Sequence, residues 1–139
     1  DRYYLMEIKQ LEPSIVPELV ATISDYGIEE RVVIASFNQV TIDELRAVAP
    51  GLLTAFSAQE MVAFQADGME PDYAPPSGFI QPPWDFVNQA MVDRAHELGL
   101  KLHPWTVNDE PVMLDLIAYG VDGIMTDDPA LLEATLGLP

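Results

Sequence analysis

Two charged side chains stand together at the end of the first β-rich segment of the chain. Residues 3–9 (YYLMEIK) have the composition of a strand, and Glu7 and Lys9 lie near its end. Because successive side chains of a strand point to opposite faces, Glu7 and Lys9 share one face. A carboxylate is a hard oxygen ligand suited to Mg²⁺ or Ca²⁺, and an ammonium group can hold a phosphate oxygen. The alternative is an ion pair that satisfies only itself.

Two aromatic residues occupy comparable places at later strand ends. Phe37 follows the apolar run RVVIAS (31–36), and Trp105 lies near the end of LKLHPWTV (100–107). Phe37 could contact a substrate, and packing is an equal alternative for this ring. Trp105 could line a site or sit in the core with its N–H satisfied.

The two histidines and the acidic run near the C-terminus offer less chemistry. We expect His96 on the outer surface of a helix and His103 in the interior as a core residue. Asp128 precedes a proline, which suits the first turn of a helix, so Asp128 is predicted to cap that helix. No serine has a histidine and an acid at a spacing useful for a hydrolase triad. The residues alone therefore assign no catalytic group.

The elements that must position these side chains alternate along the chain. Strands are expected at residues 3–9, 31–36, 52–56, 79–81, 100–107 and 121–125. Helices are expected at residues 15–26, 41–48, 58–65, 84–98, 110–119 and 129–136. This alternation predicts a parallel sheet with right-handed crossovers. An open doubly wound sheet and a (β/α)₈ barrel both remain possible, since six strands are too few for a complete barrel and no Gly-rich turn follows the first strand.

Several residues mark the expected helix ends. Gly27 suits the position just past the end of the first helix. Thr41 is expected to cap the second helix, with Glu44 completing a capping box. Asn108 is expected to cap the helix that begins near Glu110.

The composition excludes several classes of function. The chain of 139 residues has 23 acidic and 6 basic residues, a net charge of −17. A field of this sign repels nucleic acid and anionic membranes. The absence of cysteine excludes disulfides and thiolate catalysis, and no apolar run reaches the roughly 18 residues expected of a membrane-spanning helix. Cytoplasmic, periplasmic and extracellular locations all fit this composition.

Four motifs occur in order at the strand ends: MEIK (6–9), VVIASFN (32–38), AHELGLKLHPWTVN (95–108) and GVDGIMTDDP (120–129). Together they resemble the glycerophosphodiester phosphodiesterase family over essentially the whole chain. The resemblance implies a (β/α)₈ TIM barrel in which residues 1–139 form a single partial domain, supplying the third to eighth strands. The family's earlier His-Arg-Gly, Glu-x-Asp and His-Asp motifs do not occur in these 139 residues. We therefore expect the first two strands to come from a missing N-terminal barrel segment or from a swapped partner chain.

The resemblance also implies an activity, with a place in lipid and glycerol metabolism. This is metal-dependent hydrolysis of glycerophosphodiesters to sn-glycerol 3-phosphate and an alcohol such as choline or ethanolamine. It implies Glu7 as a ligand of a divalent metal, Mg²⁺ or Ca²⁺, Lys9 as a clamp on the phosphodiester, and Trp105 as a wall of the pocket. Phe37 completes the substrate-binding candidates.

The same resemblance sets limits on what this chain can do by itself. One carboxylate holds a divalent cation poorly, and the family's two catalytic histidines belong to the absent motifs. We therefore expect weak or absent metal binding and no activity from this chain alone. The alternative is a non-catalytic barrel fragment or binding module that associates with itself through exposed strand edges.

Overall fold

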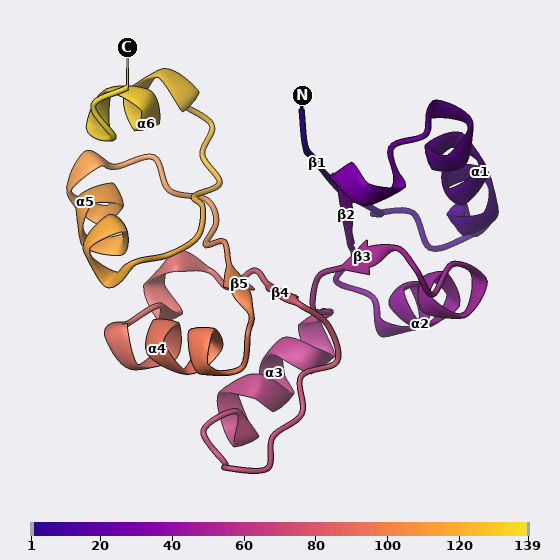
Figure 1. Ribbon diagram of the computed structural model, residues 1–139, viewed down its shortest axis with the longest axis horizontal. Coiled ribbons are helices and arrows are strands. Elements are labelled where there is room, and N and C mark those ends of the chain that lie inside the picture. The colour runs from indigo at the N-terminus through magenta and orange to yellow at the C-terminus, as the bar shows by residue number, and fades with distance from the viewer. Residues whose placement is uncertain (1, 139) are drawn as a thin grey trace. The chain divides into compact units, whose positions relative to one another are not determined.

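The computed structural model describes residues 2–138 of the chain. Strands and helices alternate along it, and the chain divides between Gly78 and Phe79 into two compact units (Figure 1). Every strand pair in both units is parallel, as the alternation predicts. Along residues 2–138, no helix has both the length and the apolar character needed to cross a bilayer.

The first unit is a three-stranded sheet with helices packed against it. Strands β1 (Tyr4–Glu7), β2 (Val32–Ala35) and β3 (Leu53–Thr54) lie in the order β1-β2-β3. Its helices are α1 (Val16–Tyr26), the short 3₁₀ helix η1 (Glu29–Arg31), α2 (Gln39–Val48) and α3 (Ala58–Asp67). Helices α1 and α2 lie on the same side of this sheet (Figure 1). The expected strands and helices of residues 3–67 are therefore confirmed, with shorter strands than predicted.

The core of the first unit lies between the sheet and its helices. It contains Ile8, Val32, Ile34, α1 residues including Ile23, and Leu45 of α2, all almost fully buried. Because Ile8 points into this layer, its two neighbours along the chain must point to the opposite face. The packing of the helices against the sheet thus decides which way Glu7 and Lys9 face.

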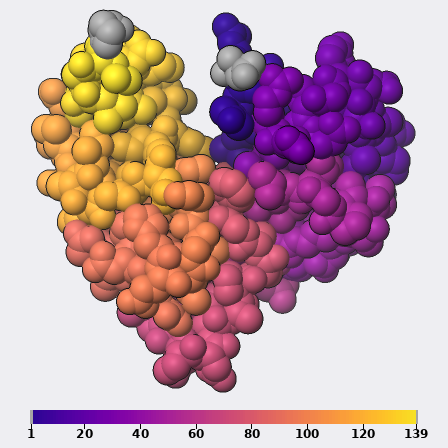
Figure 2. All heavy atoms as spheres, viewed as in Figure 1, coloured from indigo at the N-terminus to yellow at the C-terminus, as the bar shows by residue number. Residues whose placement is uncertain are grey.

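Strand β1 is an edge strand. In the described part of the first unit it pairs with β2 alone, with Glu7 opposite Ala35 in the register. Its apolar side chains are only partly covered, and Leu5 is 43% exposed. The indigo residues of this segment lie at one margin of the first unit in the space-filling view (Figure 2). An uncovered edge of this kind offers unpaired backbone groups to a further strand.

The second unit contains a two-stranded parallel sheet and further helices. Its strands are β4 (Phe79–Ile80) and β5 (Lys101–Leu102). Its helices are the short 3₁₀ helix η2 (Trp84–Phe86), α4 (Gln89–Glu97), α5 (Glu110–Tyr119) and α6 (Pro129–Thr135). Val107, Met113 and Leu116 form a buried cluster within it.

The sixth predicted strand, residues 121–125, is not a regular strand in this unit. Its backbone nevertheless lies alongside β5 and the residues after it and is hydrogen-bonded to them. Asp122 N donates to Leu102 O at 3.0 Å, Met125 N donates to Pro104 O at 2.9 Å, and Met125 O accepts Val107 N at 2.9 Å. The apolar run therefore takes the predicted place, but its bonds are too irregular for a strand.

Two helix boundaries differ from the sequence expectation. Helix α2 begins at Gln39, and the Asn38 side chain caps it by accepting the Thr41 N–H at 3.1 Å. The prediction that Thr41 caps this helix is wrong because the chain turns into the helix directly after β2. Glu44 instead accepts the Ser14 hydroxyl at 2.8 Å.

The helix expected at residues 84–98 is split into η2 and α4, and Asn88 caps α4. The boundary expectations at Gly27 and Asp128 are confirmed. Gly27 ends α1 in the left-handed conformation at φ 59°, and Asp128 accepts the Leu131 N–H at 3.0 Å.

Candidate functional site

The Glu7–Lys9 pair lies at the carboxyl end of β1. Lys9 Nζ donates to Glu7 Oε2 at 2.8 Å, and the two side chains are 76% and 32% exposed respectively. Exposed ion pairs of this kind contribute roughly 0.2–1 kcal/mol to the stability of a fold. Breaking this ion pair so that Glu7 or Lys9 can bind a ligand therefore costs little free energy. The geometry fits a binding role and an ion pair without further function equally well.

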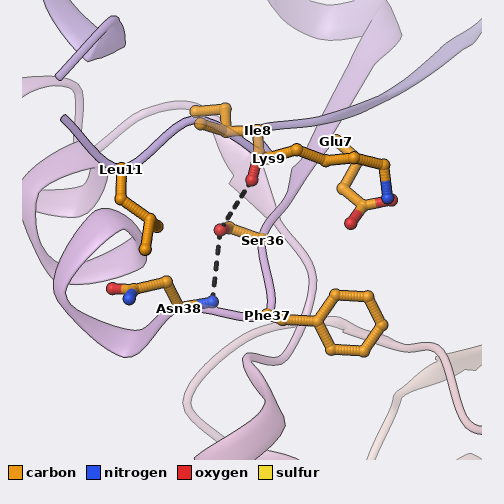
Figure 3. A pocket seen from close by; sticks show the side chains of 7 residues that line it. All are labelled: Glu7, Ile8, Lys9, Leu11, Ser36, Phe37 and Asn38. Atoms are coloured by element: carbon orange, nitrogen blue, oxygen red, sulfur yellow. Dashed lines mark hydrogen bonds and ion pairs between the residues drawn. The ribbon is translucent and has the colours of Figure 1, made fainter. Parts of the chain in front are cut away.

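A pocket of about 370 Å³ opens beside this pair. Its lining comes from the ends of β1 and β2: Glu7, Ile8, Lys9, Leu11, Ser36, Phe37 and Asn38. In the view of Figure 3, the Glu7–Lys9 pair and the Phe37 ring lie on one side of Ser36, with Leu11 and Asn38 on the other. The structure thus brings together three of the four predicted site residues.

Parallel pairing explains why these residues meet. The carboxyl ends of neighbouring parallel strands lie at the same edge of a sheet, where such folds place their ligands. The ladder between β1 and β2 continues one step past β1, since Ile8 N donates to Ala35 O at 2.8 Å. After Ala35 the chain turns toward α2 and leaves Phe37 56% exposed at the pocket rim.

The donor set of this pocket does not by itself make a cation site. Among residues 2–138, no group of three or more His, Cys, Asp or Glu side chains is placed to hold a metal ion. Glu7 is the one carboxylate among the pocket's lining residues, and Lys9 holds one of its oxygens. Because Mg²⁺ and Ca²⁺ take six or more oxygen ligands, Glu7 alone can supply only part of such a site.

Trp105, the fourth predicted site residue, belongs to the second unit. Its indole Nε1 donates to Gln81 O at 2.7 Å, and its backbone N donates to Pro82 O at 3.1 Å. Trp84 N in turn donates to Trp105 O at 3.0 Å. These bonds fix the half-buried ring in one orientation, as a pocket wall requires, and they also satisfy the N–H expected of a core tryptophan.

His96 lies as expected, whereas His103 is only partly buried and not in the core. His96 is on the surface, with Nε2 3.0 Å from Asp122 Oδ2. His103 is half-buried, and its ring packs against Phe79 with centroids 5.9 Å apart. Burial lowers the pKa of His103, opposed by Asp122 and reinforced by Lys101. The contact with Phe79 gives His103 a packing role.

A polar cluster around Asp122 was not predicted. One carboxylate oxygen accepts Lys101 Nζ at 2.7 Å, and the other accepts the Leu102 N–H at 3.0 Å. Burial alone would raise the pKa of Asp122, but the bonds from Lys101, Leu102 and His96 together lower it. The one signal in the sequence was an acid inside the apolar run VDGIM.

Asn108 has a different role from the predicted cap. Asp109 caps α5 by accepting the Val112 N–H at 3.3 Å. Asn108 Oδ1 accepts the Thr126 hydroxyl at 3.0 Å and the Asp127 N–H at 2.9 Å, while Nδ2 donates to Asp127 Oδ2 at 2.8 Å. The capping prediction for Asn108 is wrong because the side chain ties two loops together instead.

Comparison with known proteins shows the family to which this chain is similar. Residues 4–131 match the Glycerophosphoryl diester phosphodiesterase family. A glycerophosphodiester phosphodiesterase of Caldanaerobacter subterraneus is 33% identical over 91% of this chain and 52% of its own length. The chain spans about half the length of the curated relatives it matches.

Solved structures show the same fold. A crystal structure from Silicibacter pomeroyi, provisionally named a glycerophosphoryl diester phosphodiesterase, is 27% identical with a TM-score of 0.80 over 98% of this chain and 51% of that one. An Oleispira antarctica phosphodiesterase in complex with the product sn-glycerol-3-phosphate is 18% identical with a TM-score of 0.67, covering 94% and 53%. The fold is therefore an α/β fold similar to the TIM barrels of this family, and the chain belongs to the glycerophosphoryl diester phosphodiesterase family.

Proposed function

We propose that the protein to which these residues belong hydrolyses glycerophosphodiesters to sn-glycerol 3-phosphate and an alcohol. The observation that carries this is the Glu7–Lys9 pair at the rim of a pocket formed by parallel strand ends, in a chain of this family. The name of the Caldanaerobacter relative and the product bound by the Oleispira enzyme support this substrate class.

The proposed fold is a partial (β/α)₈ barrel in which residues 1–139 belong to one domain and supply the third to eighth strands. Two observations support it. The chain spans about half of its relatives' length, and β1 is an edge strand with partly exposed apolar residues. In this proposal a segment outside these residues, or a swapped second chain, pairs with β1 and completes the barrel.

The proposed roles follow the chemistry of each side chain. Lys9, whose ammonium group is largely exposed, turns from Glu7 to a phosphodiester oxygen and neutralises its charge. Glu7 supplies one oxygen ligand to a divalent cation, Mg²⁺ or Ca²⁺, whose other ligands come from outside this chain. Phe37 and Trp105 supply apolar walls for the substrate.

Proton transfer in this proposal falls to residues outside this chain. His96 is engaged by Asp122, and the His103 ring packs against Phe79. Both side chains are therefore engaged within their own unit, and the proposal assigns the general acid and base to residues outside this chain. The chain alone is expected to be inactive and to bind divalent cations weakly or not at all.

The test is hydrolysis of glycerophosphocholine with Mg²⁺ or Ca²⁺, measured for this 139-residue chain and for a longer protein that contains it. The longer protein should be active, Glu7→Ala should abolish its activity, and the chain alone should show none. Inactivity of the longer protein toward a panel of glycerophosphodiesters would contradict the proposed function. Activity of the chain alone would contradict the need for further residues.

A second candidate function is a non-catalytic module that associates with itself. The uncovered edge of β1 favours it, because an edge strand can pair with a copy of itself. Sedimentation of the chain over a range of concentrations distinguishes the two. A stable dimer that persists in the longer protein favours the module, whereas a dimer lost when the upstream segment is present favours the enzyme.

A further inference from the structure

One buried polar group in the lining of the pocket has no role in the proposed chemistry. Ser36 follows β2 and is only 3% exposed. Buried hydroxyls are normally hydrogen-bonded, and this one bridges two backbone groups. Its Oγ donates to Ile8 O at 2.8 Å and accepts Asn38 N at 3.2 Å (Figure 3).

The bond to Ile8 falls at a critical point of the chain. The last ladder bond between β1 and β2 runs from Ile8 N to Ala35 O. In a parallel ladder, the next carbonyl would accept an N–H from the neighbouring strand. Here Ile8 O accepts the Ser36 hydroxyl instead. This side-chain bond takes the place of the next backbone bond and holds the two segments together past the end of the strand.

Ile8 stands between the two charged residues of the site. Its carbonyl belongs to the peptide group that joins Ile8 to Lys9, so a bond to this oxygen fixes the backbone from which the Lys9 side chain departs. The other bond of Ser36 reaches Asn38, whose side chain caps α2. The hydroxyl therefore connects the Glu7–Lys9 strand end to the first turn of a helix.

We propose that Ser36 is a positioning residue that holds the Glu7–Lys9 strand end in its binding geometry through the carbonyl of Ile8. This rests on the proposed function for its catalytic consequence, while its geometric part stands independently. A displacement of about 1 Å in a positioning group can cost about a hundredfold in rate. Loss of this hydroxyl is therefore expected to lower turnover.

The chain offers a matched control for this experiment. Ser57 is also a buried serine of the first unit, 1% exposed, and its hydroxyl accepts the Glu60 N–H at 3.1 Å as the cap of α3. Ser36→Ala and Ser57→Ala remove the same atom at similar burial. In the longer active protein we expect kcat to fall about tenfold to a hundredfold for Ser36→Ala and less than about twofold for Ser57→Ala.

A second readout needs no activity. The chain contains two lysines, Lys9 and Lys101, so ¹³C-methylation of lysine gives one NMR signal for each, assigned by Lys9→Arg. Ser36→Ala should shift the Lys9 signal toward its position in Glu7→Gln and leave Lys101 unchanged. Ser57→Ala should leave both signals in place.

The outcomes separate the two proposals. Unchanged Lys9 signal and kcat in folded Ser36→Ala, while Glu7→Ala abolishes hydrolysis, would overturn the positioning role and leave the proposed function standing. If the longer protein hydrolyses no glycerophosphodiester, the proposed function fails and the Lys9 signal still decides the positioning role. If Ser36→Ala does not fold, Ser36→Cys, which keeps the shape and a weak donor, decides by the same readouts.

Discussion

Arg46 of α2 and Glu60 of α3 form an ion pair with two parallel contacts. Arg46 Nη2 lies 3.1 Å from Glu60 Oε2, and Nη1 bonds to Oε1. Arg46 Nε also donates to the Thr54 hydroxyl at 3.1 Å, which joins both helices to β3. Burial would raise the pKa of Glu60, but the bonds from Arg46, Ser57 and Gln39 lower it overall.

This pair should be a main polar contributor to the stability of the first unit. Glu60→Gln is expected to lower the free energy of unfolding by about 2 kcal/mol, because a two-contact bond to a charged group is lost in a mostly buried place. Urea unfolding at neutral pH measures this, with exposed Glu18→Gln as the control. Equal midpoints for both variants would contradict the prediction.

The same carboxyl sets part of the acid limit of stability. Since the folded pKa of Glu60 lies below its ordinary 4.5, the unfolded state binds more protons as the pH falls through that range. The stabilisation is present above about pH 4.5 and is lost on acidification. The stability of Glu60→Gln should therefore depend less on pH there, and parallel acid-unfolding curves would contradict this.

His103 should produce a separate loss of stability in a milder pH range. Its folded pKa lies below the ordinary 6.5 because of burial, so the unfolded state takes up the proton first as the pH falls. The free energy of unfolding should decrease between about pH 8 and pH 5. Thermal unfolding of His103→Gln across this range should show a smaller decrease in stability. The same dependence of stability on pH in both proteins would contradict the role of His103.

Gly123 lies against the His103 ring, and the space between them is too small for an added methyl group. A Cβ on Gly123 would stand 3.1 Å from His103 Cδ2, whereas a Cβ on Gly51 would meet nothing within 4 Å. Gly123→Ala should therefore cost about 1 kcal/mol by overpacking, and Gly51→Ala should cost less. In a His103→Ala background the penalty of Gly123→Ala should shrink, which a double-mutant cycle measures. If the effects of the two substitutions on stability are additive, contact with the His103 ring is not the cause of the penalty.

Asn108 makes three hydrogen bonds to residues 126 and 127 in an exposed place. Asn108→Ala should lower the free energy of unfolding by about 1 kcal/mol. Asn108→Asp keeps the acceptor but sets a carboxylate beside Asp127, so its stability should recover as the pH falls and the carboxylates are neutralised. Thermal melts at several pH values test both, and a pH-independent Asn108→Asp variant would contradict the proposed contact.

The sequence predicted the order and type of nearly all elements because buried strands and amphipathic helices have different apolar periods. The Glu7–Lys9 face was also predictable, since strand alternation depends only on spacing. The residues that cap the helices were harder to predict. Thr41 and Asn38 both have suitable side chains, and only the turn after β2 decides which of them is the cap.

The polar contacts between distant segments could not be read from spacing. Ser36 lies 28 positions from Ile8, and Asp122 meets Lys101 and His96 through the fold alone. The irregular segment 121–125 was predicted as a strand because its composition is apolar, yet its backbone bonds do not form a continuous ladder.

Each strand pairs with the next one along the chain within its unit: β1 with β2, β2 with β3, and β4 with β5. The paired residues, such as Val33 with Leu53 and Phe79 with Lys101, are therefore separated by one helical crossover only. Closing a loop of this length loses less chain entropy than closing a longer one. During synthesis, each strand–helix repeat can thus assemble on the one before it without waiting for the C-terminus to leave the ribosome.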